Sequence, residues 1–212
     1  MADAAGNKGK PIEIAGELAV LPLRNSVLFP GAIMPIDVAR PRSVVALERA
    51  GANGVLALVA QKDKDEDGPD IKLFDVGCAV RILKIIRLSK DHQTVIIQGL
   101  QRIRILDLDR SGACFVARVD QIVEPDGLDD DLVLQKAKML RVEAHRLIGQ
   151  MPALPKEASG LVDQIAHPGV LADMLVGHLD LSVEEKQQVL ETIPLAQRVD
   201  LALAHVKRAA GA

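Results

Sequence analysis

The spacing of apolar residues changes once along the chain, close to residue 125. Between Glu17 and Val123, short apolar runs alternate with turn-forming residues, which is the pattern of β-strands. Strands are predicted over residues 18–23, 33–38, 55–59, 76–88, 94–100, 103–108 and 114–123. Pro41 suits the first turn of a short helix that stops at Gly51 and closes one end of a strongly curved, mostly antiparallel sheet.

After Pro125 the apolar period lengthens to about three and a half residues, which predicts helices. Shorter helices are expected around residues 161–165 and 171–179, the second opened by Pro168. Ser182 and Glu185 form a capping-box pattern before another helix. The residues that define the longest helix and the last one are Val133, Ala137, Leu140, Ala144 and Leu147, then Leu195, Val199, Leu203 and Val206.

These patterns predict an α+β protein with two lobes. We expect a flexible tail over residues 1–14, a β-rich lobe over 15–124 and a helical lobe over 125–212. The last amphipathic helix is still running where the sequence stops. This suggests either a truncation before a further domain or an ordinary C-terminal helix.

Composition narrows the possible partners. The chain has no Trp or Tyr, three Phe and a net charge of -3, which argues against nucleic-acid binding by base stacking or by a basic surface. No apolar run is long enough for a transmembrane helix, no secretory signal opens the chain, and Cys78 and Cys114 are far apart. We therefore expect a soluble cytoplasmic protein without a membrane partner, in which both cysteines are small core residues.

The residue patterns give no catalytic or cofactor site. Asp63, Asp65, Asp67 and Gly68 match the opening of a calcium loop, but Phe74 stands where the bidentate Glu is needed. A solvated acidic loop is therefore favoured over a metal site. The five histidines lack ligand spacing and are expected at the surface or at helix ends.

A basic excess along the predicted strands allows two interpretations. It is either a nucleic-acid face or, as strand alternation favours, the solvated exterior of a barrel. The residues concerned are Arg81, Lys84, Arg87, Lys90, Arg102, Arg104, Arg110 and Arg118.

The segment over residues 21–36 combines three prolines with a dense series of apolar residues. Proline disrupts regular strand pairing, so part of the segment is expected to be a loop. Its apolar side chains either form an accessible surface for extended peptides or turn inward to close the barrel.

This segment, LPLRNSVLFPGAIMPIDV, followed by RPRSVVALERA, resembles the start of the LON substrate-binding domain family. Further motifs follow in the order found in that family. They are LALVAQKDKDEDGPD, LFDVGCAVRILKIIRL and VIIQGLQRIRIL, and then the helical stretch from HPGVLADML to AHVKRA. Positions at which the family often has Tyr are aliphatic or polar here, which leaves the substrate preference open.

The resemblance implies a PUA-like curved antiparallel β lobe followed by an α-helical bundle. In the family these lead into an AAA+ ATPase and a Ser-Lys peptidase, whose motifs the sequence lacks. The chain alone is then expected to be non-catalytic, to need no metal or cofactor, and to leave ATP and Mg²⁺ to the missing ATPase domain.

The function implied is recognition of unfolded, damaged or degron-bearing proteins for ATP-dependent proteolysis. Other subunits of a hexamer are the expected partners, and the isolated domain could self-associate weakly. The alternatives are a mainly structural role in setting hexamer geometry and a free-standing PUA-like module for nucleic acid or a small ligand. The predicted substrate contacts are Leu23, Val27, Leu28, Phe29, Ile33 and Met34, with Arg40 and Arg42 as charged selectors.

Overall fold

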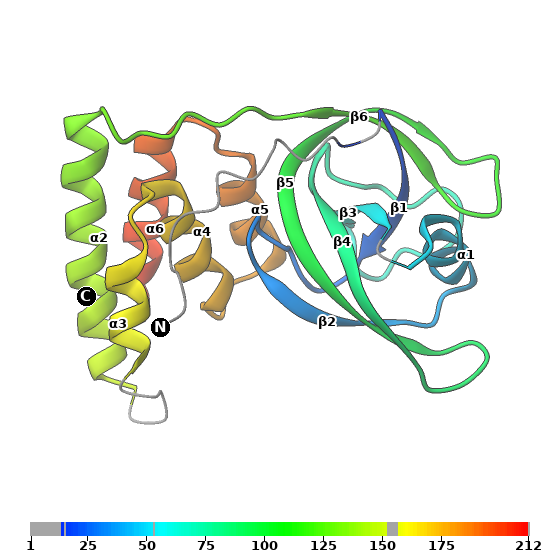
Figure 1. Ribbon diagram of the computed structural model, residues 1–212, viewed down its shortest axis with the longest axis horizontal. Helices are drawn as coiled ribbons and strands as arrows, with labels where there is room; N and C mark the ends of the chain where they lie inside the picture. Colours follow the sequence, from blue (N-terminus) through cyan, green and yellow to red (C-terminus); the bar gives the residue numbers. More distant parts are fainter. Residues whose placement is uncertain (1–13, 15, 53, 152–156, 212) are drawn as a thin grey trace.

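The computed structural model describes residues 14, 16–52, 54–151 and 157–211, so nearly all of the expected tail over 1–14 lies outside the described residues. The molecule is elongated, with a β lobe at one end and a helical lobe at the other (Figure 1). The α+β class and the order of the two lobes are as the sequence predicts. The connection over residues 122–130 runs along one side of the molecule from β6 to α2 (Figure 1).

The described strands form one sheet that closes on itself. They are β1 (Glu17–Leu23), β2 (Ile33–Val38), β3 (Val55–Ala60), β4 (Val76–Arg87), β5 (Gln93–Asp109) and β6 (Val116–Gln121), in the order β2-β5-β4-β3-β1-β6. An additional pairing of β5 with β6 closes a barrel, and β2 stays outside the ring on β5. The sheet is mixed rather than wholly antiparallel, because β1 and β3 run parallel.

The sequence divided β5 wrongly into two strands. Polar Gln101 and Arg102 suggested a break, but β5 continues through them and pairs with β4 across register shifts at two bulges. Its first half also pairs with β2 and its second half with β6. Gly99 is required on this strand because a Cβ there would lie 2.4 Å from the carbonyl oxygen of Phe29. One strand therefore holds three neighbours in place.

Both faces of β1, β3 and the first half of β4 are covered, which explains the nearly continuous apolar runs of these strands. Leu18 and Val20 belong to one apolar cluster, whereas Ala19 and Leu21, on the opposite face of β1, belong to a second. The helix α1 (Pro41–Ala50) buries Leu47 in the second cluster and lies at the barrel end away from the helical lobe (Figure 1). This is the predicted helix, with Pro41 in its first turn.

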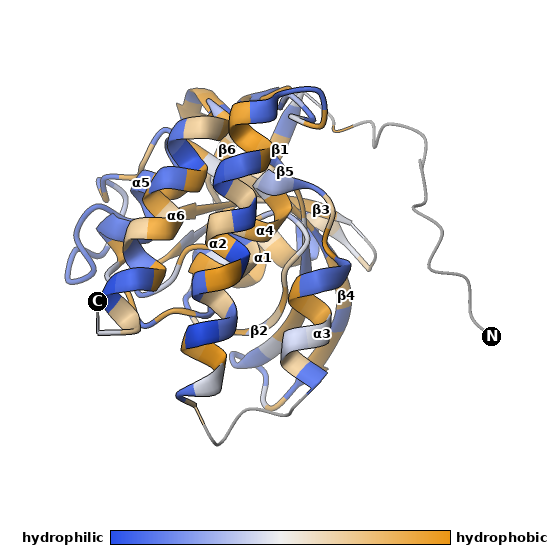
Figure 2. Ribbon diagram, turned by 90° about the vertical axis from the view of Figure 1, so that its left-hand side faces the viewer, coloured by the Kyte–Doolittle hydropathy of each residue, from blue (hydrophilic) through white to orange (hydrophobic). Residues whose placement is uncertain are grey.

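The helical lobe contains the elements that the longer apolar period predicts. They are α2 (Asp131–Gly149), α3 (Glu157–Gln164), α4 (Pro168–His178), α5 (Val183–Glu191) and α6 (Leu195–Ala209). The predicted capping box is present at α5, where Ser182 and Glu185 bond reciprocally to backbone amides. In Figure 2, hydrophilic and hydrophobic residues alternate along α2 and α6 as expected for amphipathic helices.

The two lobes share one apolar core. Val27 and Phe29, with Ala60 and Val76 of the barrel strands, lie in the same cluster as the buried residues of α2, α4, α5 and α6. The side chain of Gln187 on α5 adds a buried hydrogen bond of 2.9 Å to the carbonyl oxygen of Val76. The lobes are therefore packed together as one unit.

A buried ion network lies at the same junction. Arg102 of β5 is fully buried and donates both terminal nitrogens to Asp173 of α4, at 2.6 and 2.7 Å. It also donates to the carbonyl oxygen of Leu190 at 2.8 Å and pairs with Glu124 at 3.1 Å. Burial alone would lower the pKa of Arg102, because it disfavours the charged guanidinium. The carboxylates of Asp173 and Glu124 have the larger combined effect and raise this pKa. Arg198 of α6 pairs with Glu124 as well.

We use the name lobe junction for Arg102, Asp173, Glu124 and Arg198 together with Phe29, whose ring lies 6.0 Å from the Arg102 guanidinium. The expectation that Arg102 belongs to a solvated barrel exterior was wrong. The helical lobe covers this part of β5, and the carboxylates of Asp173 and Glu124 compensate the buried charge.

The predictions for cysteines and histidines hold with one exception. Cys78 and Cys114 are buried, and burial raises the pKa of the Cys78 thiol to about 12, so that it stays protonated. His167 caps α4 with its ring nitrogen and His178 lies in the last turn of that helix. His205 is buried on α6 instead of lying at the surface, because it is on the packed face of that helix.

Across the part of the chain that the structure describes, no helix has the length and apolar content to cross a membrane. The same residues contain no cluster of three or more His, Cys, Asp or Glu side chains placed to hold a metal ion.

Candidate peptide-binding groove

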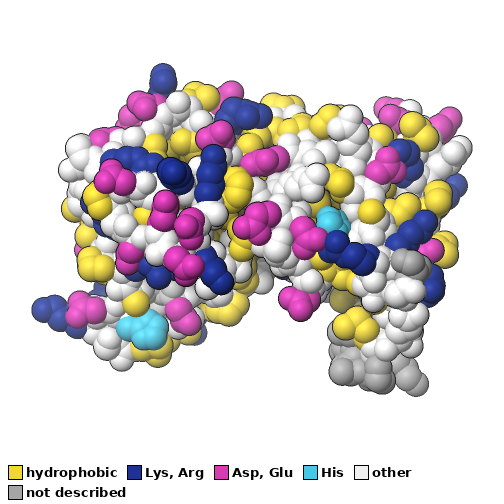
Figure 3. Space-filling view, turned by 180° about the vertical axis from the view of Figure 1, so that it is seen from behind, with side chains coloured by type: hydrophobic (Ala, Val, Ile, Leu, Met, Phe, Trp, Pro, Cys, Tyr) yellow, Lys and Arg dark blue, Asp and Glu magenta, His cyan; other side chains and the backbone are white. Residues whose placement is uncertain are grey.

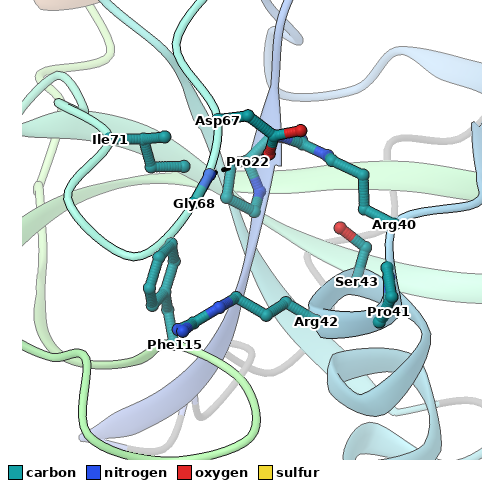
Figure 4. Close-up of a pocket in the computed structure, with 9 residues that line it drawn as sticks. All are labelled: Pro22, Arg40, Pro41, Arg42, Ser43, Asp67, Gly68, Ile71 and Phe115. Atoms are coloured by element: carbon teal, nitrogen blue, oxygen red, sulfur yellow. Dashed lines mark hydrogen bonds between the residues drawn. The ribbon is translucent and has the colours of Figure 1, made fainter.

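Two adjoining cavities lie where β1, β2 and α1 meet, with volumes of about 340 and 380 Å³. Both are lined by Pro22, Arg40 and Ser43, so we treat them as one site and name it the Arg40 groove. The first cavity, shown in Figure 4, is completed by Asp67, Gly68 and Phe115 together with Pro41, Arg42 and Ile71. The second extends over residues 21–26 and 34–40.

Arg40 joins three separate parts of the chain in this groove. It lies just before α1 and donates to the side chain of Gln61 at 2.6 Å and to the carbonyl oxygen of Pro22 at 2.5 Å. Burial and the nearby Arg24 lower the pKa of Arg40 from its ordinary value. A guanidinium with so high an ordinary pKa stays charged, so the groove has a fixed positive group at its centre.

The acidic loop over residues 62–70 forms one wall of the groove. The buried amide of Gln61 donates to the carbonyl oxygens of Asp63 and Glu66, at 3.1 and 3.0 Å, and ties the loop to the barrel. Asp67 pairs with Arg24 at 2.9 Å. The Gly68 amide and then Arg24 hold the pKa of Asp67 below its ordinary value. The carboxylate of Asp67 is therefore bonded to protein groups within this wall.

Aromatic and basic groups meet at the far wall of the first cavity. The guanidinium of Arg42 lies 4.6 Å from the centre of the Phe115 ring, and that of Arg110 lies 5.2 Å from the same ring. These distances are in the range of cation–π contacts. Arg42 points across the cavity from α1 toward Phe115 (Figure 4). The two guanidinium groups therefore pack over a ring that is itself buried.

Half of the predicted contact residues lie at this groove. Leu23, Met34 and Arg40 line the second cavity, and Arg40 and Arg42 line the first. Ile33 is 60% exposed at the start of β2, next to Met34. Pro35, in the same strand, explains why this segment is accessible, since proline restricts a strand to the edge of a sheet.

The other predicted contacts, Val27, Leu28 and Phe29, are buried and were wrongly expected to be accessible. Val27 and Phe29 pack in the core shared by both lobes, and Leu28 packs in the barrel core. The segment over residues 21–36 therefore combines both alternatives that its sequence allowed. Its ends line the groove, whereas its middle turns inward because the helical lobe offers an apolar surface.

Sequence reasoning missed Arg24, Ser43, Gln61 and Asp67. Their positions depend on the closure of the barrel, which brings together residues far apart in the chain, and only Pro35 signalled an edge strand nearby. Lys and Arg are interspersed with Asp and Glu over the face seen in Figure 3.

Comparison with known proteins identifies the family of this chain. Residues 17–208 match the model of the ATP-dependent protease La (LON) substrate-binding domain. The chain belongs to this family. The Lon protease of Anaeromyxobacter dehalogenans is 35% identical over 98% of the chain, and Lon protease 2 of Myxococcus xanthus is 35% identical over 92%.

The similarity covers a limited part of those relatives. The chain spans 25% of the Anaeromyxobacter protein and 24% of the Myxococcus protein. By its family, the chain is thus a Lon substrate-binding domain and not a catalytic part. This confirms the resemblance noted in the sequence.

Solved structures confirm the fold. The N-terminal domain of the Mycobacterium avium complex Lon protease superposes with a TM-score of 0.71 over 90% of this chain and 98% of that one, at 21% identity. A Lon N-terminal domain protein from Xanthomonas campestris gives a TM-score of 0.62 over 89% and 97%, at 20% identity. The Lon domain fold is thus shared although most side chains differ.

Proposed function

We propose that this Lon domain captures unfolded or damaged polypeptides in the Arg40 groove for ATP-dependent proteolysis by the full-length protein. The observation that carries the proposal is the match of residues 17–208 to a substrate-binding domain family. The groove supports it, because apolar Ile33 and Met34 adjoin the charged Arg40. Unfolded chains expose apolar side chains and unpaired backbone groups, and such a mixed surface can bind both.

The proposal extends to the assembly. Curated relatives are about four times as long as this chain, and we propose that the remainder supplies an ATPase ring in which six domains act together. Effective concentration then converts weak single contacts into useful avidity. Weak contacts suit a protease that must release and grip its substrate repeatedly.

A role in hexamer organisation is the second part of the proposal. Leu132, Met139 and Val142 are more than half exposed on α2 and follow helical spacing, so they share one face. An apolar stripe of this kind suits contact with a neighbouring subunit. Replacing all three residues with Gln should weaken association of the full-length protein, measured by sedimentation velocity, and should leave capture by the isolated domain unchanged.

The first test is binding of the purified domain to carboxymethylated lactalbumin, which is permanently unfolded, measured by fluorescence anisotropy. Native lactalbumin and a DNA duplex are measured in parallel. Binding of the unfolded form alone supports the proposal. If neither protein binds, the domain is structural, and salt-sensitive binding of the duplex alone would identify a nucleic-acid module.

Variants locate the site. Replacing Ile33 and Met34 together with Ser should weaken capture several-fold with little loss of stability, because Ile33 is 60% exposed and Met34 is only partly buried. A matched control replaces the exposed Leu106 and Leu88 with Ser, which removes similar apolar surface elsewhere on the barrel. Equal weakening in both variants would place capture outside the groove.

A further inference from the structure

Within the part of the chain that the structure describes, β2 is paired along one of its two edges. Among the described residues it pairs with β5 alone, from Ile33 opposite Gln98 to Val38 opposite Gln93. It lies outside the closed ring, so the closure of the barrel does not cover its second edge. Unpaired backbone amides and carbonyls on a sheet edge can pair with another extended chain.

The register identifies the groups on the unpaired edge. In an antiparallel ladder, alternate residues direct their amide and carbonyl toward the partner strand. The carbonyl of Ala32 accepts from the Gly99 amide at 2.8 Å, so Met34, Ile36 and Val38 also face β5. The backbone groups of Ile33, Pro35 and Asp37 then face away. Pro35 is consistent with this assignment: proline has no amide hydrogen, and a residue that faces away from β5 needs none for that pairing.

The Arg40 groove runs along this same edge. A cavity on the face of a strand touches every second residue, because successive side chains point to opposite faces. The second cavity is instead lined by every residue from 34 to 40, which places it along the edge. Its other wall is the continuous stretch over 21–26, where Arg40 already occupies the carbonyl oxygen of Pro22. The β2 edge is therefore the open side.

We propose that an extended segment of an unfolded polypeptide binds in the groove as an added strand on β2. This inference rests on the proposed function and defines its ligand class as a backbone in β conformation. Recognition through backbone groups requires no particular side-chain sequence, which suits unfolded proteins of many kinds. Exposed Ile33 supplies the adjoining apolar contact.

Pro35 sets the strength of this pairing. Three residues on the free edge offer three carbonyl acceptors but two amide donors, those of Ile33 and Asp37. An added strand therefore forms an interrupted ladder at its centre and binds less tightly than on a complete edge. The interruption also limits edge-to-edge aggregation of the domain.

The test removes the two amides without removing a bond to β5. Asp37→Pro with Ile33→Pro deletes both outward donors, whereas Asp37→Ala with Ile33→Ala keeps them. The alanine pair is the matched control because the Asp37 side chain also accepts from the Thr94 hydroxyl at 2.7 Å. Affinity for carboxymethylated lactalbumin should fall roughly tenfold further in the proline pair, as expected for two lost hydrogen bonds.

A second measurement uses the unchanged domain, so it stands even if the proline variant fails to fold. A short peptide of alternating Leu and Ser, capped by Lys at each end, is compared with the same peptide N-methylated at every second residue. Weaker binding of the methylated peptide supports strand addition, because methylation blocks one edge of the peptide. Equal binding of both peptides, or of the proline and alanine pairs, overturns strand addition and leaves substrate capture standing. Absence of lactalbumin binding by the unchanged domain overturns the proposed function itself.

Discussion

The lobe junction and the Arg40 groove are each organised by an arginine that connects distant parts of the chain. Arg102 is fully buried, and its guanidinium is bonded to Asp173, Glu124 and a carbonyl oxygen. Arg40 is only partly buried and borders cavities of several hundred cubic ångströms. The guanidinium of Arg102 is surrounded by protein partners and fixes how the lobes pack. The charged guanidinium of Arg40 instead lies beside an open cavity. The same side chain thus serves architecture in one place and binding in the other.

Replacing Arg102 with Met should give the largest effect. The substitution leaves the buried carboxylate of Asp173 without its main partner, which costs roughly 3–5 kcal/mol of unfolding free energy. Urea denaturation followed by circular dichroism measures this cost. Adding Asp173→Leu should recover much of the loss, since the second buried charge is then gone. A stable single variant would show that Arg102 does not hold the lobes together.

Replacing Phe29 with Ala tests the apolar half of the lobe junction. Phe29 is 2% exposed, and removal of a buried aromatic ring leaves a cavity that costs about 3 kcal/mol. Ile33→Ala, four positions along the same segment, should change the unfolding free energy by less than about 0.5 kcal/mol because Ile33 is exposed. Similar losses for the two variants would remove the distinction between the middle of the segment and its end.

Replacing Arg40 with Met should separate binding from stability at the groove. Loss of the bonds to Gln61 and Pro22 costs about 1 kcal/mol, well below the effect at Arg102. Capture of carboxymethylated lactalbumin should nevertheless fall several-fold, because the groove loses its central charge and the support of its wall. Arg104→Met, an exposed position on β5, serves as the control for loss of a positive charge. Unchanged capture with Arg40→Met would remove Arg40 from the site.

The smallest effect concerns Asp67 at low pH. The Gly68 amide and Arg24 lower the pKa of Asp67 in the folded protein, so folding favours its ionised form. This contribution is complete above the ordinary value of 3.8 and is lost as the pH falls through the lowered folded value. In a carbon NMR titration of the Asp67 carboxyl, Arg24→Gln should move the midpoint upward, toward 3.8. An unmoved midpoint would mean that the pair with Arg24 is too weak to order the acidic loop.

Elements set by local periodicity were predicted well. The helices and the capping box at Ser182 follow from apolar spacing and short-range hydrogen bonding. The strands were found for the same reason, although Gln101 and Arg102 wrongly divided β5. Polar residues on one strand do not reveal whether a distant helix covers them.

The site was predicted only in part because it is formed by tertiary contacts. Met34 and Arg40 lie at the groove, as the proline-rich segment suggested, but Phe29 is inside the core of both lobes. An apolar side chain gives the same signal in a sequence whether it faces solvent or a second lobe. Gln61 was missed because its role depends on the position of the acidic loop that it holds.

Closure of the barrel also bears on the speed of folding. The pairing of β1 with β6 joins Glu17 to Arg118, so the ring closes only after about a hundred residues have been brought together. Helical contacts between neighbouring elements form faster than strand pairings of such long range. Ring closure should therefore limit the refolding rate. The helices should dock only after that step, because they pack on the core around Phe29 that both lobes share. Stopped-flow refolding of Ala117→Gly, which weakens β6, should be slowed more than that of Ser182→Ala at the start of α5.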